Sequence, residues 1–333
     1  MVLFYQMHDF IAIGDIVTDA FIKLKDASVH CDINNEKCQI CMAFGEKIPY
    51  QSVEEISAVG NSPNASIAAA KLGLKSALVS NLGDDSLGHE CLETLEAANV
   101  DTQYVTVHAG KKSNYHYVLW YESDRTILIK HEKYDYKLPD FGIPKWTYLS
   151  SLGPSAMIYH SEILKYLNEH SEINLAFQPG TFQISASSEL KGIYKRTKIF
   201  FCNIEEAERI LDIDTLGIKE LLNRVKELGP EIVVITDGPN GAYAYDGANI
   251  YFQPAWPDQK PAYDRTGAGD AFASTTTAAI ALGLDLPMAL KWAAINAMSV
   301  VQQLGAQKGL LSRTQIEDYL KSAKPEFETK VLN

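Results

Sequence analysis

The sequence has no apolar run that approaches the length of a membrane span, and its start reaches Tyr5, His8 and Asp9 too soon for a signal peptide. It also has no surplus of basic residues, because 30 Lys and Arg stand against 42 Asp and Glu, giving a net charge of -12. No cluster of Lys and Arg with interleaved aromatic residues is visible, as a nucleic-acid surface would require. We therefore expect a cytoplasmic protein that binds neither membrane nor nucleic acid.

Cysteine is scarce as well, and the sequence contains no internal repeat or low-complexity linker. The five cysteines do not form the even framework of a secreted disulfide scaffold. Hydrophobic residues make up 46% and charged residues 22% of the 333, as in ordinary globular proteins. The length fits one large α/β domain over residues 1–333 that carries a smaller appendage.

The most informative stretch is the glycine-rich turn Asp264–Asp270, which precedes an apolar run reaching Leu282. Its glycines suit a sharp bend close to a ligand, and the run behind them has the length and alanine content of a buried helix. The first amides of that helix lack internal partners and lie at the positive end of its dipole. The amides of Gly267, Ala268 and Gly269 are therefore expected to point at a bound anion.

Asp270 stands in the first turn of this expected helix, beside the anion. A carboxylate in that place would repel a bound anion, but it could remove a proton from an attacking hydroxyl group. The alternative is that Asp270 only favours the positive end of the helix dipole. The turn alone does not decide between the two interpretations, because short glycine motifs often occur by chance.

Downstream of Trp146 the sequence alternates between strand and helix patterns with short turns. This alternation predicts a doubly wound, mainly parallel α/β sheet flanked by helices, with ligands at the carboxyl ends of its strands. The earlier region, near residues 21–25 and 51–59, favours a small two-sided sheet. Strands predicted at Tyr104–Val107 and Tyr115–Tyr121 are expected to pair with each other or with that small sheet.

A second helix start follows Val59 and Gly60. Ser62 is a candidate N-cap, Pro63 suits the first helical position, and Gly73 suits the residue after the last turn. This helix, too, is expected to begin at a ligand.

Two further motifs follow predicted strands. Asn203 and Glu206 could be an N-cap with a first-turn acid, oxygen ligands for a metal-bridged phosphate, or both. The group Thr236–Gly241 follows the next strand. Both motifs are expected at the carboxyl edge of the sheet.

In their order and combination, these motifs resemble those of the ribokinase, or PfkB, family of carbohydrate kinases, from about Ile11 to Leu311. The resemblance implies a ribokinase-like fold with a small β-sheet lid, formed by segments of about 17–58 and 103–131. It also implies transfer of the γ-phosphoryl group of ATP, with Mg²⁺, to a hydroxyl of a small sugar. Asp270 would then be the general base, and the amides of Gly267 to Gly269 the anion hole.

The same resemblance implies roles for other residues. Asp19, Gly60 and Asn64 would bind the substrate together with Asp270, and Asn203 and Glu206 would order Mg²⁺ and phosphates, largely through water. The remaining nucleotide-binding positions that it implies are Thr236, Gly238, Gly241, Asp264 and Asn296. A monovalent cation near Asp264 and a homodimer formed through the lid are further expectations of this kind.

Three positions depart from the family pattern. Val59 replaces the first glycine of a pair, and Ser150–Gly153 stand where ribokinase itself carries an acidic residue. Arg265 replaces a threonine, and it could contact a nucleotide phosphate or lie on the surface. Specificity for ribose is therefore not expected from the resemblance.

Two alternatives to a sugar kinase remain. A nucleoside kinase of the same family would be favoured if aromatic side chains such as Tyr115, Tyr117 and Trp120 stack a base. A non-catalytic protein that senses sugars or nucleotides is the alternative from another class. Asp270 argues against it, because a pure binder gains nothing from a carboxylate beside an anion.

A cysteine-rich insertion at residues 28–46 falls within the first lid segment. His30, Cys31, Cys38 and Cys41 offer four soft ligands, and the Cys-x-x-Cys half has the spacing of a zinc knuckle. The alternatives are reduced thiols that pack a loop, and a redox or disulfide role. The sequence does not choose among the three.

Overall fold

A computed structural model of the chain describes residues 8–31, 38–121, 124–214, 216–257 and 260–332. Its centre is an 11-stranded sheet with the strand order β17-β16-β15-β14-β13-β12-β11-β1-β6-β7, in which β8 also pairs with β6. The parallel strands are β1 (Phe10–Ile13), β6 (Ser76–Gly83), β7 (Val100–Asp101), β8 (Val105–His108), β11 (Trp146–Leu149), β12 (Asn174–Phe177), β13 (Ile199–Asn203) and β14 (Ile232–Thr236). The antiparallel edge consists of β15 (Ala242–Tyr245), β16 (Ile250–Gln253) and β17 (Lys330–Leu332).

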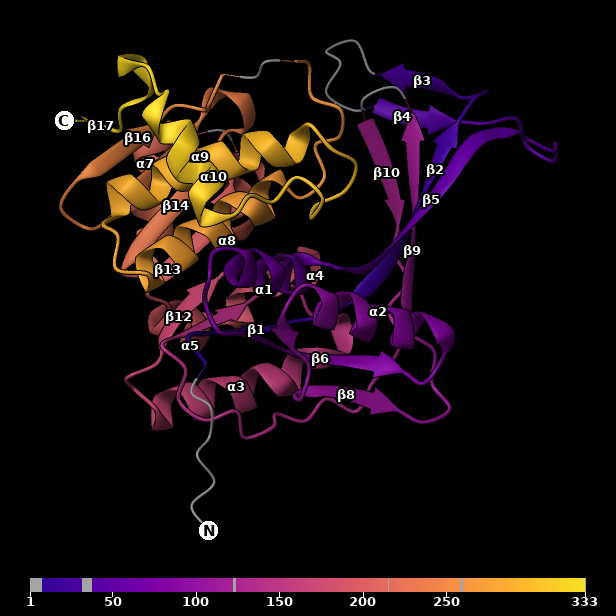
Figure 1. The fold of residues 1–333 in the computed structure, drawn as a ribbon, viewed down its shortest axis with the longest axis horizontal. Coiled ribbons are helices and arrows are strands. Elements are labelled where there is room, and N and C mark those ends of the chain that lie inside the picture. Colours follow the sequence, from indigo (N-terminus) through magenta and orange to yellow (C-terminus); the bar gives the residue numbers. More distant parts are fainter. Residues whose placement is uncertain (1–7, 32–37, 122–123, 215, 258–259, 333) are drawn as a thin grey trace.

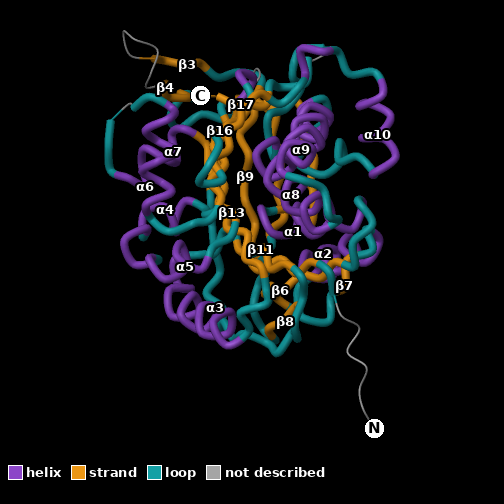
Figure 2. Tube along the Cα trace, turned by 90° about the vertical axis from the view of Figure 1, so that its left-hand side faces the viewer, coloured by secondary structure: helices purple, strands orange, loops and turns teal. Residues whose placement is uncertain are grey.

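Helices cover both faces of this sheet (Figure 2). One layer contains α1 (Asn61–Lys71), α2 (Ser86–Ala97), α8 (Ala268–Ala281), α9 (Leu286–Val301) and α10 (Arg313–Lys321). The other contains α3 (Met157–Glu169), α4 (Thr181–Ser185), α5 (Lys191–Arg196), α6 (Ile204–Leu211) and α7 (Ile218–Glu227). Short 3-10 turns occur at Pro154–Ala156, Ser187–Glu189, Gly238–Asn240 and Pro325–Phe327. The predicted doubly wound, mainly parallel architecture is confirmed.

The central strands are mostly apolar and buried because both of their faces are covered. Every residue of β1 is buried, and alternate residues belong to the two different core clusters, with Phe10 and Ala12 on one side and Ile11 and Ile13 on the other. Such continuous apolar runs distinguish a doubly covered strand from the half-exposed strands of the small sheet.

The second sheet, called the small sheet here, has the strand order β10-β9-β2-β5. Its strands are β2 (Val17–Leu24), β5 (Tyr50–Val59), β9 (Asn114–Tyr121) and β10 (Asp124–Leu128). It rises from one end of the α/β body, at the upper right of Figure 1. Phe21, Val118 and Trp120 pack on its inner face with Leu304 of the body.

Two expectations from the sequence were wrong. The strand near 104–107 does not pair with the other aromatic strand or with the small sheet, because β8 lies parallel to β6 in the central sheet. The second segment of the small sheet therefore begins at Asn114. Ser62 is not an N-cap either, since α1 begins at Asn61 after Gly60, and the Ser62 hydroxyl hydrogen-bonds to that of Ser150 at 2.5 Å.

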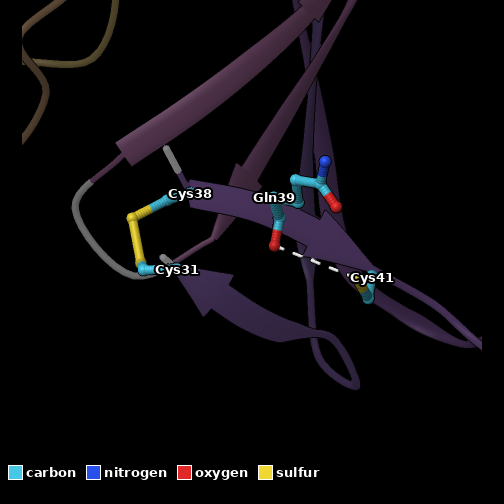
Figure 3. Close-up of a disulfide and its surroundings, with 4 residues drawn as sticks. All are labelled: Cys31, Cys38, Gln39 and Cys41. Carbon is cyan, nitrogen blue, oxygen red and sulfur yellow. Dashed lines mark hydrogen bonds between the residues drawn. A yellow bond between two sulfur atoms is a disulfide. The ribbon is translucent and has the colours of Figure 1, made fainter. Parts of the chain in front are cut away.

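The cysteine-rich insertion forms an exposed hairpin of β3 (Ser28–Cys31) and β4 (Cys38–Cys41). Figure 3 shows a disulfide between Cys31 and Cys38, which consumes two of the four possible zinc ligands. His30 instead pairs with the Ser28 hydroxyl at 3.2 Å. No group of three or more potential metal ligands occurs within the described parts of the chain, so the zinc-knuckle interpretation of His30, Cys31, Cys38 and Cys41 was wrong.

Candidate active site

A cavity of about 570 Å³ lies between the carboxyl ends of the central strands and the small sheet. The body contributes residues that lie one or two positions after β1, β11 and β12 or that end β13 and β14, as the strand-end rule for open α/β sheets requires. The small sheet contributes Asp19, His116 and Arg125. Gly60, Asn64, Asn203, Glu206, Thr236, Gly267, Gly269 and Asp270, all predicted as site residues, also line it.

The glycine-rich turn is fixed by Asp264, which is buried. Its Oδ1 accepts hydrogen bonds from the amide and hydroxyl of Thr266 at 2.9 and 2.6 Å, and its Oδ2 accepts one from the amide of Gly305 at 2.8 Å. Gly267 has a φ of 76°, and a Cβ there would lie 2.2 Å from the Cβ of Ala306. Asp264 thus shapes the turn from behind and does not line the cavity.

Helix α8 begins at Ala268, with Gly267 as its uncapped N-cap. The amide of Ala268 donates to the carbonyl of Arg265 at 3.4 Å. In the described chain the amides of Gly269 and Asp270 have no such partner, and Gly269 lines the cavity, where an added Cβ would meet only Gln178 Nε2 at 4.0 Å. The anion hole stays a prediction: of its expected donors the amide of Ala268 is engaged, whereas Gly269 and the adjacent Asp270 offer free amides.

Three side-chain amides hold the carboxylate of Asp270. Its Oδ1 accepts hydrogen bonds from Asn61 Nδ2 at 2.9 Å and Gln178 Nε2 at 3.0 Å, and its Oδ2 accepts one from Asn64 Nδ2 at 2.8 Å. Burial raises the pKa of Asp270, whereas these donors and the charge of Arg125 act in the opposite direction. The result is an oriented carboxylate at the start of α8.

One end of the cavity contains two pairs of a carboxylate with a histidine. Asp15 accepts hydrogen bonds from the amide of Gly153 at 2.7 Å and the hydroxyl of Tyr136 at 2.9 Å, and it lies 3.2 Å from His131 Nδ1. The second pair joins Asp19 Oδ1 and His116 Nδ1 at 3.5 Å.

Several polar atoms around this end are buried without a hydrogen-bond partner among the described residues. They are Asp19 Oδ1, His116 Nε2 and Arg125 Nε. Because an unpaired buried polar atom is costly, such atoms at a cavity wall indicate contacts that a ligand completes.

Asn203 and Glu206 open helix α6 with a reciprocal capping box. The Glu206 amide donates to Asn203 Oδ1 at 2.7 Å, and the Asn203 amide donates to Glu206 Oε2 at 3.0 Å. The cap leaves Glu206 Oε1 without a partner in the described chain while the residue lines the cavity. The structural and the ligand-facing interpretations of this pair are therefore compatible.

Five predicted nucleotide-binding or anion-hole residues do not line the cavity: Gly238, Gly241, Asp264, Ala268 and Asn296. Asn296 has no exposed surface, because its amide donates to Thr275 at 2.7 Å and its oxygen accepts from the amide of Leu311 at 2.9 Å. It joins α9 to α8 and to the loop before α10. Gly238 and Gly241 have positive φ values, so they shape the turn after β14.

Sequence reasoning missed six residues of the site: Asp15, Asn61, His116, Arg125, His131 and Gln178. Asp15 and Gln178 each follow shortly after a buried strand, so the strand-end rule could have found them. Asn61 lies inside a motif that was recognised. Arg125 and His131 carried no local signal, because only the pairing of distant strands brings them here.

The sequence profile of the pfkB family carbohydrate kinase matches residues 22–313. The chain belongs to this family. This chain is therefore a carbohydrate kinase of the ribokinase type. That group includes both sugar kinases and nucleoside kinases. The family assignment agrees with the order of motifs in the sequence.

Relatives of this pfkB chain include both sugar kinases and nucleoside kinases. Ribokinase from Bacillus subtilis is 26% identical over 269 residues, covering 78% of this chain and 87% of its own. A nucleoside kinase from Methanothermobacter thermautotrophicus is 27% identical over 264 residues, covering 75% and 80%. The structure of Arabidopsis thaliana ribokinase complexed with ribose and ATP has a TM-score of 0.79 at 19% identity, covering 95% of this chain and 99% of its own.

Proposed function

We propose that this kinase transfers the γ-phosphoryl group of ATP to a hydroxyl, most simply a hydroxymethyl, of a small sugar, with Asp270 as the general base. The observation that carries the proposal is the position of Asp270. Its carboxylate lies at the cavity wall beside the free amides of Gly269 and Asp270, which offer a site for phosphate oxygens. A carboxylate in contact with that site is explained by proton removal and not by anion binding.

In this mechanism Asp270 takes the proton of the substrate hydroxyl as its oxygen forms a bond to the γ-phosphorus. The bond from phosphorus to the β,γ-bridging oxygen breaks, and ADP leaves. The amides at the start of α8 stabilise the negative charge on the transferred group because they are fixed before the reaction. Arg125, whose Nε is unpaired, is placed to add positive charge from the small sheet.

The donor set also fits a magnesium nucleotide. Oxygen ligands suit Mg²⁺, and Glu206 would bind it through water with its free Oε1, while Asn203 and Thr236 contact the phosphates. Bound Mg²⁺ would neutralise charge on the β- and γ-phosphates. A monovalent cation near Asp264 is less well supported, since both oxygens of that carboxylate already hold backbone amides.

A sugar fits the cavity better than a nucleoside. Tyr115, Tyr117 and Trp120 do not line it, because Tyr115 bonds to Glu55 and Trp120 packs against Tyr263. Among the rings that do line it, His131 meets Phe182 at an interplanar angle of 81° and His116 at 64°. Rings arranged edge to face offer no slot between parallel faces for a base, whereas the buried carboxylates suit vicinal hydroxyls.

Replacement of Asp270 by Asn tests the function. The variant keeps the size and polarity of the side chain but loses its basicity, so kcat should fall by roughly 10² to 10⁴-fold. Nucleotide affinity should change much less, because the backbone amides stay in place. Transfer of labelled phosphate from ATP, measured over a panel of sugars and nucleosides, gives both the rate and the acceptor.

Three outcomes of this test would contradict the proposal. A variant that keeps more than a third of wild-type kcat, with transfer rate-limiting, would show that Asp270 is not the base. Absence of transfer from the wild-type protein to any sugar or nucleoside, with ligand binding intact, would favour a sensor. Equal loss of ATP binding and activity would instead make Asp270 a structural residue of the turn.

The proposal extends to the small sheet as a lid and to its outer face as a dimer interface. This face exposes large apolar side chains, among them Tyr50, Val53 and Tyr117, each about half exposed. Sedimentation analysis would test dimer formation.

The location we propose is the cytoplasm, where ATP is abundant, and cell fractionation would test it. In the described chain no helix has both the length and the apolar character to cross a membrane.

A further inference from the structure

The amide of Gln178 lies between Asp270 and a buried tyrosine. Gln178 directly follows β12, and its Nε2 donates to Asp270 Oδ1 at 3.0 Å. Its Oε1 accepts a hydrogen bond from the hydroxyl of Tyr148, which lies on β11. Tyr148 has no exposed surface, so its hydroxyl cannot turn to water instead.

This chain of hydrogen bonds has one consistent direction. An ionised carboxylate only accepts, so the nitrogen of the Gln178 amide must face Asp270 and its oxygen must face Tyr148. Burial raises the pKa of Tyr148, which keeps the phenol protonated and able to donate. A flipped amide would place its oxygen against a carboxylate oxygen, and repulsion disfavours that arrangement.

The two oxygens of Asp270 differ in occupancy. Oδ1 accepts two hydrogen bonds, from Asn61 and Gln178, whereas Oδ2 accepts one, from Asn64. Each carboxylate oxygen has room for about two donors. Oδ2 is therefore the oxygen with a free site for the proton of the substrate.

We propose that Gln178 is a positioning residue for Asp270, that Tyr148 fixes the orientation of its amide, and that together they direct Oδ2 toward the substrate hydroxyl. The proposal rests on Asp270 being the base. It predicts that loss of the Gln178 donor makes Asp270 easier to protonate, because a hydrogen bond to the ionised form favours that form.

Other charged groups face Asp270 from the elements around it. Arg125 of β10 lowers its pKa, and the carboxylate of Glu206 on α6 interacts with it unfavourably. Arg265 lines the same cavity. All three are left unchanged in the variants below, so a shift in pH dependence reports on the hydrogen bond alone.

The experiment is the rate of a single turnover, measured by rapid quench against pH for Gln178→Leu, Tyr148→Phe and the double variant. The wild-type rate should fall on the acid side as Asp270 is protonated. In Gln178→Leu this fall should move up by about one pH unit, as expected when an ionised carboxylate loses one of its hydrogen bonds. Tyr148→Phe should give a smaller shift in the same direction, and the double variant no more than Gln178→Leu, because the two side chains act as one unit.

Gln303→Leu is the matched control, since it makes the same substitution at an exposed position outside the cavity and should leave the profile unchanged. A rate that is lowered equally at every pH in Gln178→Leu, with the acid limb unmoved, would overturn the proposal and indicate packing alone. Additive shifts in the double variant would also overturn it. Asp270→Asn separates the two claims: if it retains the wild-type rate and acid limb, the assignment of the base has failed, and this proposal with it.

Discussion

Gly267 occupies a backbone conformation and a space that only glycine fits. Its φ is 76°, and an added Cβ would lie 2.2 Å from that of Ala306. We expect Gly267→Ala to lower the free energy of unfolding by roughly 2 to 5 kcal/mol, which combines backbone strain with overpacking. Urea denaturation followed by circular dichroism measures this change.

Gly283 provides the matched control for that substitution. It has a φ of 90°, but a Cβ there would meet nothing within 4 Å. Gly283→Ala should therefore cost only the backbone term of about 1 to 2 kcal/mol. Equal losses in the two variants would show that the contact with Ala306 contributes nothing.

The first turn of helix α6 contains Glu206, which caps the helix and lines the cavity. Burial raises the pKa of Glu206, so the folded state binds its proton more tightly than the unfolded state. The stability that this group contributes is present below its unfolded pKa of about 4.5 and is lost as the pH rises through the higher folded value. Glu206→Gln keeps a cap acceptor and removes the buried charge. It should raise the thermal midpoint at pH 7, and the gain should disappear near pH 4.

Glu205 offers the comparison within the same helix turn. Glu205 is exposed, so Glu205→Gln removes one negative charge, as Glu206→Gln does, but the charge it removes is in contact with solvent. Because an acid in the first turn interacts favourably with the helix dipole, this variant should be slightly less stable than the wild type at pH 7. A loss of stability at pH 7 in Glu206→Gln would show that the charge of Glu206 does not destabilise the folded protein in the absence of nucleotide.

At the scale of the whole molecule, the hairpin of β3 and β4, which carries the Cys31–Cys38 disulfide, is not needed for the fold of the body. Among the described strands, β3 and β4 pair only with each other. We expect a reductant to change the thermal midpoint of the body by less than about 2 °C, because the hairpin opens as a separate unit. A larger shift would indicate that the hairpin packs on the body.

Alkylation of cysteines, counted by mass spectrometry, tests the pairing itself. Cys41 is a half-exposed free thiol, whereas Cys91 and Cys202 are buried. The folded protein should take up one label without reductant and three with it, and all five only after denaturation. Three labels without reductant would contradict the disulfide.

More than a tenth of an equivalent of zinc after purification without added metal would support the metal interpretation instead.

The sequence was a good guide wherever the signal was local. The turn at Gly267, the Asn203 and Glu206 pair and the alternation after Trp146 each reflect short-range preferences that the structure keeps. It was a poor guide to β8, because a short apolar strand looks the same at the edge of either sheet. Arg125 and His131 reach the site only through the pairing of distant segments, and no local pattern encodes that.

Helix α1 packs against α8, so segments from the first and the last third of the chain lie side by side on the central sheet (Figure 1). Nearly all of α1 is buried, including Ile67 and its run of alanines. During synthesis, α1 leaves the ribosome long before α8 exists to cover it. We expect the nascent chain to present this apolar helix to chaperones, and to gain activity only once the last third has been translated. A chain cut before α8 would be an aggregating fragment, not a weak kinase.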